Sequence, residues 1–253
     1  MLASGVVAGL GWRAGALSTG GGIAGVLIGT LILLGAGWQG GAVLAAFFVS
    51  SSLVSRITSR RSPAGVLDAK GNRRDAWQVL ANGGAAAAAA VIAGPQSLLS
   101  IWLVSASLAA AAADTWATSI GLLSPTPPRL LWNNRPVPAG TSGGVTMAGV
   151  AGGLVGAGMV GLTAALVTGR SRLALGAMLV GFAGMLMDSL LGGTLQGRFY
   201  CLHCGQDSEW KQHRCGCKTE FRGGLAWLNN DAVNGLATTL AALLAWALWY
   251  QLD

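Results

Sequence analysis

Residues 97–122 read SLLSIWLVSASLAAAAADTWATSIGL, an apolar run with a single charged side chain, Asp114. A helix needs about 20 mainly apolar residues to cross the hydrocarbon core of a bilayer, so this run predicts a membrane-spanning helix. The other apolar stretches are 2–12, 20–36, 38–55, 77–93, 143–167, 173–191 and 230–250. The first of them is short for a span. The sequence therefore predicts an all-α transmembrane helix bundle with seven or eight spans.

The composition is also that of a membrane protein. Apolar residues make up 53% of the 253-residue chain and charged residues only 10%, against roughly 25% charged in soluble domains. The 40 glycines suit helices that pack closely in lipid. These proportions exclude a soluble globular domain, a disordered chain and a disulfide-rich secreted scaffold. We expect one integral membrane domain over residues 1–253, without a cleavable signal peptide.

Positive charge is concentrated in alternate loops. If the loop at 56–76 is cytoplasmic, that side of the membrane carries all but two of the 16 Lys and Arg residues, the exceptions being Arg170 and Arg172. Cytoplasmic loops of membrane proteins collect Lys and Arg. The net charge of +7 therefore reflects topology, and no nucleic acid partner is expected. The long polar loops share this side, so we expect an active site that faces the cytoplasm from the cell or plasma membrane.

Three aspartates lie near the cytoplasmic ends of apolar spans, namely Asp114, Asp188 and Asp231. A carboxylate at membrane depth costs roughly 2.5–3.5 kcal/mol on insertion scales, so it usually marks a functional site. Several carboxylates around an aqueous cavity suit a hard cation such as magnesium. Structural roles are the alternative, because Asp231 could cap the last helix and Asp188 could pair with an arginine.

A turn rich in Gly, Ser and Thr opens the span at 143–167. It consists of Gly140, Thr141, Ser142, Gly143 and Gly144. Backbone N–H groups at a helix N-terminus attract phosphate, and Arg135 lies just upstream. The turn is not a Walker A loop, because no Lys follows the glycines. It predicts either a phosphate-binding turn or an ordinary capped helix with Gly at a close crossing.

The basic loop at 56–76 leads into a polar helix face. Its arginines, which include Arg73 and Arg74, can bind anionic headgroups or nucleotide phosphates, although topology alone explains most of them. Gln78 and Asn82 follow four residues apart on one face of the next helix. We expect that face to point into the bundle.

All four cysteines fall in one cytoplasmic loop at 192–229. Cys201 and Cys204 have the C-x-x-C spacing of a zinc site, and Cys215 and Cys217 follow. A reducing compartment favours metal binding over disulfides. We expect these four cysteines to hold a structural zinc ion that staples the loop, with His213 as an alternative ligand and free thiols as the alternative reading.

Five short motifs occur in order along nearly the whole chain. They are 81–84 (ANGG), 114–118 (DTWAT), 140–145 (GTSGGV), 188–192 (DSLLG) with Gln196, and 230–234 (NDAVN). Together they resemble the family known as domain of unknown function 92, which includes the plant phytyl-phosphate kinases and the animal transmembrane protein 19 group. The family usually has Glu where this chain has Ser119. A more distant similarity is to dolichol kinases and phosphatidate cytidylyltransferases.

The resemblance implies an enzyme that moves the γ-phosphate of a nucleotide, with CTP expected, onto an isoprenoid monophosphate such as phytyl phosphate. On this interpretation magnesium is held by Asp114, Asp188 and Asp231. The residues expected to contact phosphate or orient ligands are Arg73, Arg74, Asn82, Arg135, Gln196, Asn230 and Asn234, together with the turn at 140–144. A cytidylyltransferase acting on a lipid phosphate and a non-enzymatic lipid or ion transporter are the alternatives.

Overall fold

The computed structural model describes residues 2–61, 73–208, 210–213 and 215–249. Within these residues the chain forms seven helices. Their bounds are α1 Leu2–Arg13, α2 Thr19–Ser59, α3 Ala76–Ile92, α4 Leu98–Gly121, α5 Met147–Thr168, α6 Arg172–Thr194 and α7 Asn230–Leu248. The basic loop predicted to continue beyond Arg61 lies largely outside the described residues, up to Arg73.

Five of these helices are long and apolar enough to cross a membrane, namely α2, α4, α5, α6 and α7. The α3 helix is apolar but shorter, at 17 residues, and α1 has 12. The helical, membrane-type architecture expected from the sequence is therefore confirmed. The count of seven or eight spans is not confirmed, and it stays a prediction.

The α2 helix is bent back on itself at Gly37. This residue has φ 63° and ψ −163°, in a region that only Gly adopts without strain. A Cβ atom built on Gly29 would lie 3.7 Å from Cδ2 of Leu44, whereas these two positions of a straight helix would be about 22 Å apart. The two arms of α2 thus correspond to the separate apolar stretches 20–36 and 38–55.

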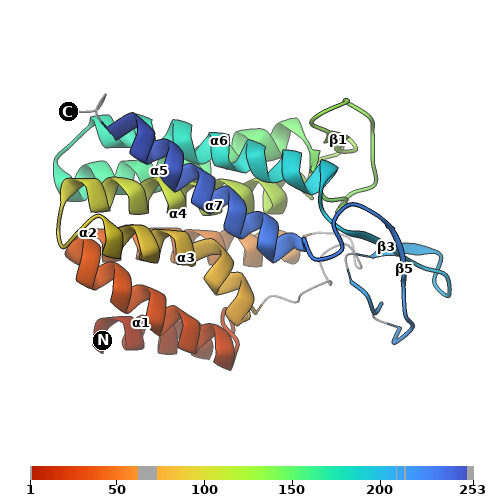
Figure 1. Ribbon diagram of the computed structural model, residues 1–253, viewed down its shortest axis with the longest axis horizontal. Coiled ribbons are helices and arrows are strands. Elements are labelled where there is room, and N and C mark those ends of the chain that lie inside the picture. The colour runs from red at the N-terminus through yellow and green to blue at the C-terminus, as the bar shows by residue number, and fades with distance from the viewer. Residues whose placement is uncertain (1, 62–72, 209, 214, 250–253) are drawn as a thin grey trace.

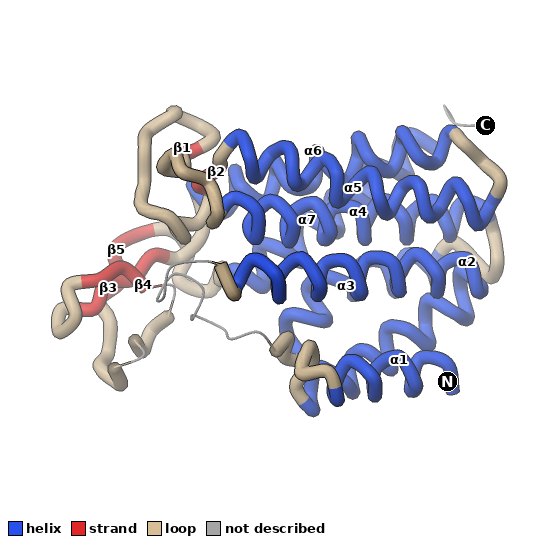
Figure 2. Tube along the Cα trace, turned by 180° about the vertical axis from the view of Figure 1, so that it is seen from behind, coloured by secondary structure: helices blue, strands red, loops and turns tan. Residues whose placement is uncertain are grey.

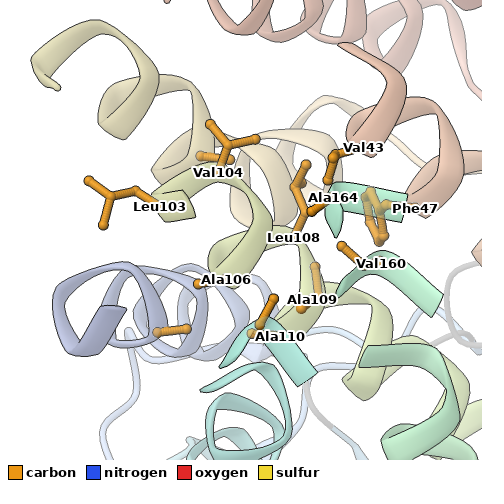
Figure 3. Packing of buried hydrophobic residues seen from close by; sticks show 14 of the residues in the cluster. Val43, Phe47, Leu103, Val104, Ala106, Leu108, Ala109, Ala110, Val160 and Ala164 are labelled. Carbon is orange, nitrogen blue, oxygen red and sulfur yellow. The ribbon is translucent and has the colours of Figure 1, made fainter. Parts of the chain in front are cut away.

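The α4 helix lies at the centre of the bundle. It packs against α2, α3, α5, α6 and α7, and all of its side chains from Ser100 to Ala113 are buried. Figure 3 shows Leu108 of this helix among side chains of α2 and α5. Small residues allow the helices to approach closely, because a Cβ atom on Gly181 of α6 would lie only 2.5 Å from that of Ala109.

The two ends of the bundle differ. The strands and long loops gather at one end, while both termini lie at the other (Figures 1 and 2). Two small antiparallel sheets form there, one from β1 and β2 and one with the strand order β4-β3-β5. The strands are β1 Arg129–Leu130, β2 Gly144–Val145, β3 Arg198–Cys201, β4 Gln206–Ser208 and β5 Glu220–Gly223. These strands were not expected from the sequence.

Candidate active site at the loop-rich end of the bundle

Three polar side chains from three helices meet inside the bundle. The carboxyl groups of Asp114 on α4 and Asp188 on α6 lie within hydrogen-bonding distance of each other. With its amide nitrogen turned toward acceptors, Asn234 on α7 donates to Oδ2 of Asp188 at 2.8 Å and to the carbonyl of Asn230 at 3.3 Å. These residues are distant in sequence, but α4 and α6 end, and α7 begins, at the loop-rich end. We call Asp114, Asp188 and Asn234 the acidic cluster.

The acidic cluster has the chemistry of a cation site. Two carboxylates in such proximity repel each other unless they share a proton or a cation. Asn234 is buried and supplies one neutral donor to Asp188, which cannot balance the charge of two carboxylates. A divalent cation would neutralise both carboxylates with the oxygen ligands that magnesium prefers.

The Gly-rich turn lies against the same helix as Asp188. A Cβ atom on Gly143 would overlap Gly193 and would lie 2.6 Å from the carbonyl oxygen of Ser189, the residue that follows Asp188. The side chain of Gln196 donates to Oγ of Ser142 at 3.0 Å. The structure therefore brings the turn and Gln196 together, next to the helix that supplies one of the two carboxylates.

The turn offers fewer free N–H groups than the sequence indicated. The N–H of Thr141 donates to the carbonyl of Pro138, and that of Gly144 donates to the carbonyl of Thr141. The helix itself starts later than expected, because Thr146 is its N-cap and accepts from the N–H of Gly149 at 3.0 Å. Any phosphate contact would thus rest on the middle of the turn.

Asp231 does not complete a three-carboxylate site. Within the described residues, no three carboxylates each place an oxygen within 4.8 Å of the other two. The alternative role as helix cap is wrong, because the cap of α7 is Asn229, whose side chain accepts from the N–H of Ala232 at 2.9 Å. Asp231 follows in the first helical turn, where a negative charge is favourable.

A largely apolar cavity of about 220 Å³ lies between α1, α2 and α3. Arg74, Gln78 and Asn82 line it where α3 begins, at the loop-rich end. The Arg74 guanidinium lies over the rings of Phe47 and Phe48, 5.7 and 5.9 Å from their centroids. Burial lowers the pKa of Arg74 to about 10, so it remains a cation at neutral pH. The cavity thus combines apolar walls with one positive charge.

Near the start of α3, Gln78 and Asn82 form local hydrogen bonds. Gln78 and Asp75 form a capping box, in which each side chain bonds the backbone of the other residue. The amide of Asn82 donates to the carbonyl of Gln78 at 3.0 Å. Arg73 and Arg135 are exposed on loops. The contact of Arg74 with Phe47 and Phe48 had no signal in the sequence because it depends on the fold of α2.

The cysteines gather beside the three-stranded sheet. Cys201, Cys204, His213 and Cys215 place their ligand atoms within 4.8 Å of one another. Cys217 belongs to a second group, with His203 and Cys215. The structure therefore joins His213, the alternative ligand, to three of the four cysteines expected at the site.

The sequence of the whole helical bundle matches one family. A model of the family described as "Integral membrane protein DUF92" matches residues 2–242. The chain belongs to the DUF92 family. This DUF92 protein is 33% identical to Protein PGR of Arabidopsis thaliana over 79% of each chain. It is 32% identical to an uncharacterised membrane protein of Methanocaldococcus jannaschii, over 67% of this chain and 71% of the relative.

A third relative is a membrane protein of Synechocystis, 29% identical over 87% of this chain and 77% of its own length. No solved structure matches the chain. The resemblance drawn from the five motifs is thus confirmed at the level of the family.

Ser119, the position at which the sequence departs from the resemblance, has a defined place in this DUF92 protein. It is buried on α4, and its hydroxyl lies 3.2 Å from that of Ser55 on α2. A neutral hydroxyl pair therefore links α2 and α4 at this position. The acidic cluster does not include this position.

Proposed function

We propose that this DUF92 protein is a magnesium-dependent membrane phosphotransferase. It moves the γ-phosphoryl group of a nucleoside triphosphate, with CTP as the first candidate, onto an isoprenoid monophosphate such as phytyl phosphate. The observation that carries the proposal is the acidic cluster, assembled from three helices beside the turn at Gly143. Phosphoryl transfer requires mainly positioning and charge neutralisation, and this arrangement offers both.

The acidic cluster fits the cation that such a reaction needs. Asp114 and Asp188 would hold magnesium, and the bond from Asn234 to Asp188 would fix the orientation of one carboxylate. When bound, magnesium neutralises phosphate charge during transfer. Asp231 and Asn230, one turn before Asn234, remain candidates for contacts through water or substrate.

The lipid substrate supplies its own nucleophile. An oxygen of its monophosphate is already anionic, so no general base is required. That oxygen forms a bond to the γ-phosphorus while the bond from this phosphorus to the β–γ bridging oxygen breaks, which leaves CDP and a lipid diphosphate. The protein has to hold two anionic groups in line and to shield them from water.

The cavity between α1, α2 and α3 suits the apolar tail. The helix α3, which supplies Asn82 to this cavity, also contacts α7, because the hydroxyl of Thr238 donates to the carbonyl of Ala81 at 3.0 Å. Thr238 lies one helical turn after Asn234 of the acidic cluster. In our proposal the tail lies along the apolar walls of the cavity, while Arg74 and Asn82 hold the head group at its loop-rich end.

The orientation in the membrane is part of the proposal. The loop-rich end carries most of the Lys and Arg residues, and the positive-inside rule assigns such an end to the cytoplasm. A soluble nucleotide would reach the acidic cluster from that side. We propose the plasma membrane as the location.

Labelled nucleotide tests the reaction directly. Purified protein would be incubated with phytyl phosphate, magnesium and CTP labelled at either the α- or the γ-phosphate. We expect γ-label in the lipid product and none from the α-position. Label from the α-position would instead indicate a cytidylyltransferase. No label from either position, with several nucleotides and prenyl phosphates, would contradict an enzymatic role and favour transport.

A further inference from the structure

The loop between α6 and α7 holds a second cluster with a different chemistry. Sγ of Cys201 lies 3.7 Å from Sγ of Cys215, and Nδ1 of His213 lies 3.3 Å from the same sulfur. Cys204 completes a set of four ligand atoms within 4.8 Å of one another. None of the four cysteines is in a disulfide. Three sulfurs and one imidazole nitrogen thus surround one small volume.

The spacing of these atoms is that of a tetrahedral metal site. Zinc–sulfur bonds of about 2.3 Å in a tetrahedron place two sulfurs about 3.8 Å apart, and a sulfur and a nitrogen about 3.6 Å apart. The observed separations of 3.7 and 3.3 Å agree with these values to within a few tenths of an ångström. We propose that Cys201, Cys204, His213 and Cys215 bind one structural zinc ion.

This ligand set excludes Cys217 from the first coordination shell. Cys217 groups only with His203 and Cys215, which makes three ligands, whereas structural zinc takes four. The four-member set combines the buried Cys201 with the exposed Cys204 and Cys215. A closed set of four protein ligands leaves no position for a reacting water, so the ion would be structural and not catalytic.

The loop has little else to hold it. Its strands are only three or four residues long. Phe199 and Phe221 form an edge-to-face pair within it, with ring centroids 5.6 Å apart. A metal bond can supply the missing folding energy of such a small unit. Zinc here would replace the hydrophobic core that the loop lacks.

The zinc site would also support the neighbouring candidate active site. The strand β3, which ends at Cys201, begins two residues after Gln196, the partner of Ser142 in the Gly-rich turn. After β5 the chain returns to this point, where Leu225 donates to the carbonyl of Leu195 and Gly197 to that of Leu228. The α7 helix follows directly. The ion would therefore fix both the position of Gln196 and the start of α7.

Zinc content of purified protein in detergent, with any affinity tag removed, tests the proposal. We expect about one zinc per chain by mass spectrometry of the metals. Cys204→Ser and His213→Ala should each lose most of it. Cys217→Ser and His203→Ala are matched controls, because they make the same two substitutions at a cysteine and a histidine of the same loop. Both should keep the zinc.

Several results would overturn the proposal. They are a wild-type protein without zinc, a site filled with iron, and zinc that is lost from the two control variants but kept in Cys204→Ser and His213→Ala. If a ligand variant cannot be purified, a thiol reagent titrated into wild-type protein gives a second measurement. Zinc release that follows modification of the cysteines supports the site, and complete modification without any zinc release contradicts it. Neither readout depends on phosphotransferase activity.

Discussion

Asp114→Asn is expected to abolish phosphotransfer while leaving the bundle folded. Asparagine has the size of aspartate and can donate a hydrogen bond to Asp188, so the contact between α4 and α6 should survive. The change removes one of the two carboxylates proposed to hold magnesium. Losing one preorganised electrostatic contact of this kind costs at least about 100-fold in turnover. The measurement is transfer of γ-label from CTP to phytyl phosphate by purified protein, with thermal unfolding followed in parallel.

The matched control is Asp207→Asn. Asp207 lies on β4 with an exposed side chain and belongs to neither the acidic cluster nor the Gly-rich turn, so its variant should keep full turnover. If the two carboxyl groups had a purely structural role, Asp114→Asn would have the opposite effect. It would remove the repulsion between Asp114 and Asp188, leave activity intact and raise the unfolding temperature. Full turnover in that variant would remove Asp114 from the mechanism.

Gly143→Ala is the second change with a large expected effect. Gly143 has φ 78°, and a methyl group there would collide with Gly193 and with the carbonyl of Ser189. The turn would have to move away from α6, and the bond between Ser142 and Gln196 would lengthen or break. We expect turnover to fall by at least about tenfold, since misplacement by about 1 Å near a reacting centre costs as much or more.

Gly169→Ala separates this collision from backbone strain. Gly169 has a similar φ of 70°, but nothing lies within 4 Å of the added methyl group. Both variants should carry the cost of about 1–2 kcal/mol for Ala in the left-handed region, measured as a lower free energy of unfolding. Only Gly143→Ala should lose activity. Equal activity in the two variants would show that the turn does not position substrate.

Helix positions could be predicted from the sequence because long apolar runs have few alternatives in a membrane. The stretch 97–122 became α4, Leu98–Gly121, and the break between 20–36 and 38–55 falls at Gly37, where the chain reverses. The stretch 143–167 begins too early, because residues 144–145 form β2 and Thr146 caps the helix. The helix begins after Thr146 because the side chain of Thr146 accepts a hydrogen bond from the backbone of Gly149, and hydropathy does not report such a bond.

The candidate site was predictable as a set of residue types but not as a set of contacts. Asp114 and Asp188 stood out as carboxylates at apolar spans, and Asn234 was expected from the family resemblance, yet nothing in the sequence indicates that Asn234 donates to Asp188. The same limit applies to His213, whose spacing allowed several ligand sets. The aromatic contact of Arg74 also depends on packing between elements distant in sequence. The N–H groups of Thr141 and Gly144 are engaged locally, by carbonyl groups close by in the chain, which residue types alone do not indicate.

Manganese binding tests the central claim, that Asp114 and Asp188 together hold a divalent cation. Manganese prefers the same oxygen ligands as magnesium, and the electron paramagnetic resonance signal of the free ion reports how much is bound. We predict saturable binding to the wild-type protein and to Asp207→Asn, and an affinity lower by at least about tenfold in Asp114→Asn and Asp188→Asn, because ligand charge sets affinity at such sites. Equal manganese affinity in all four proteins would contradict the claim.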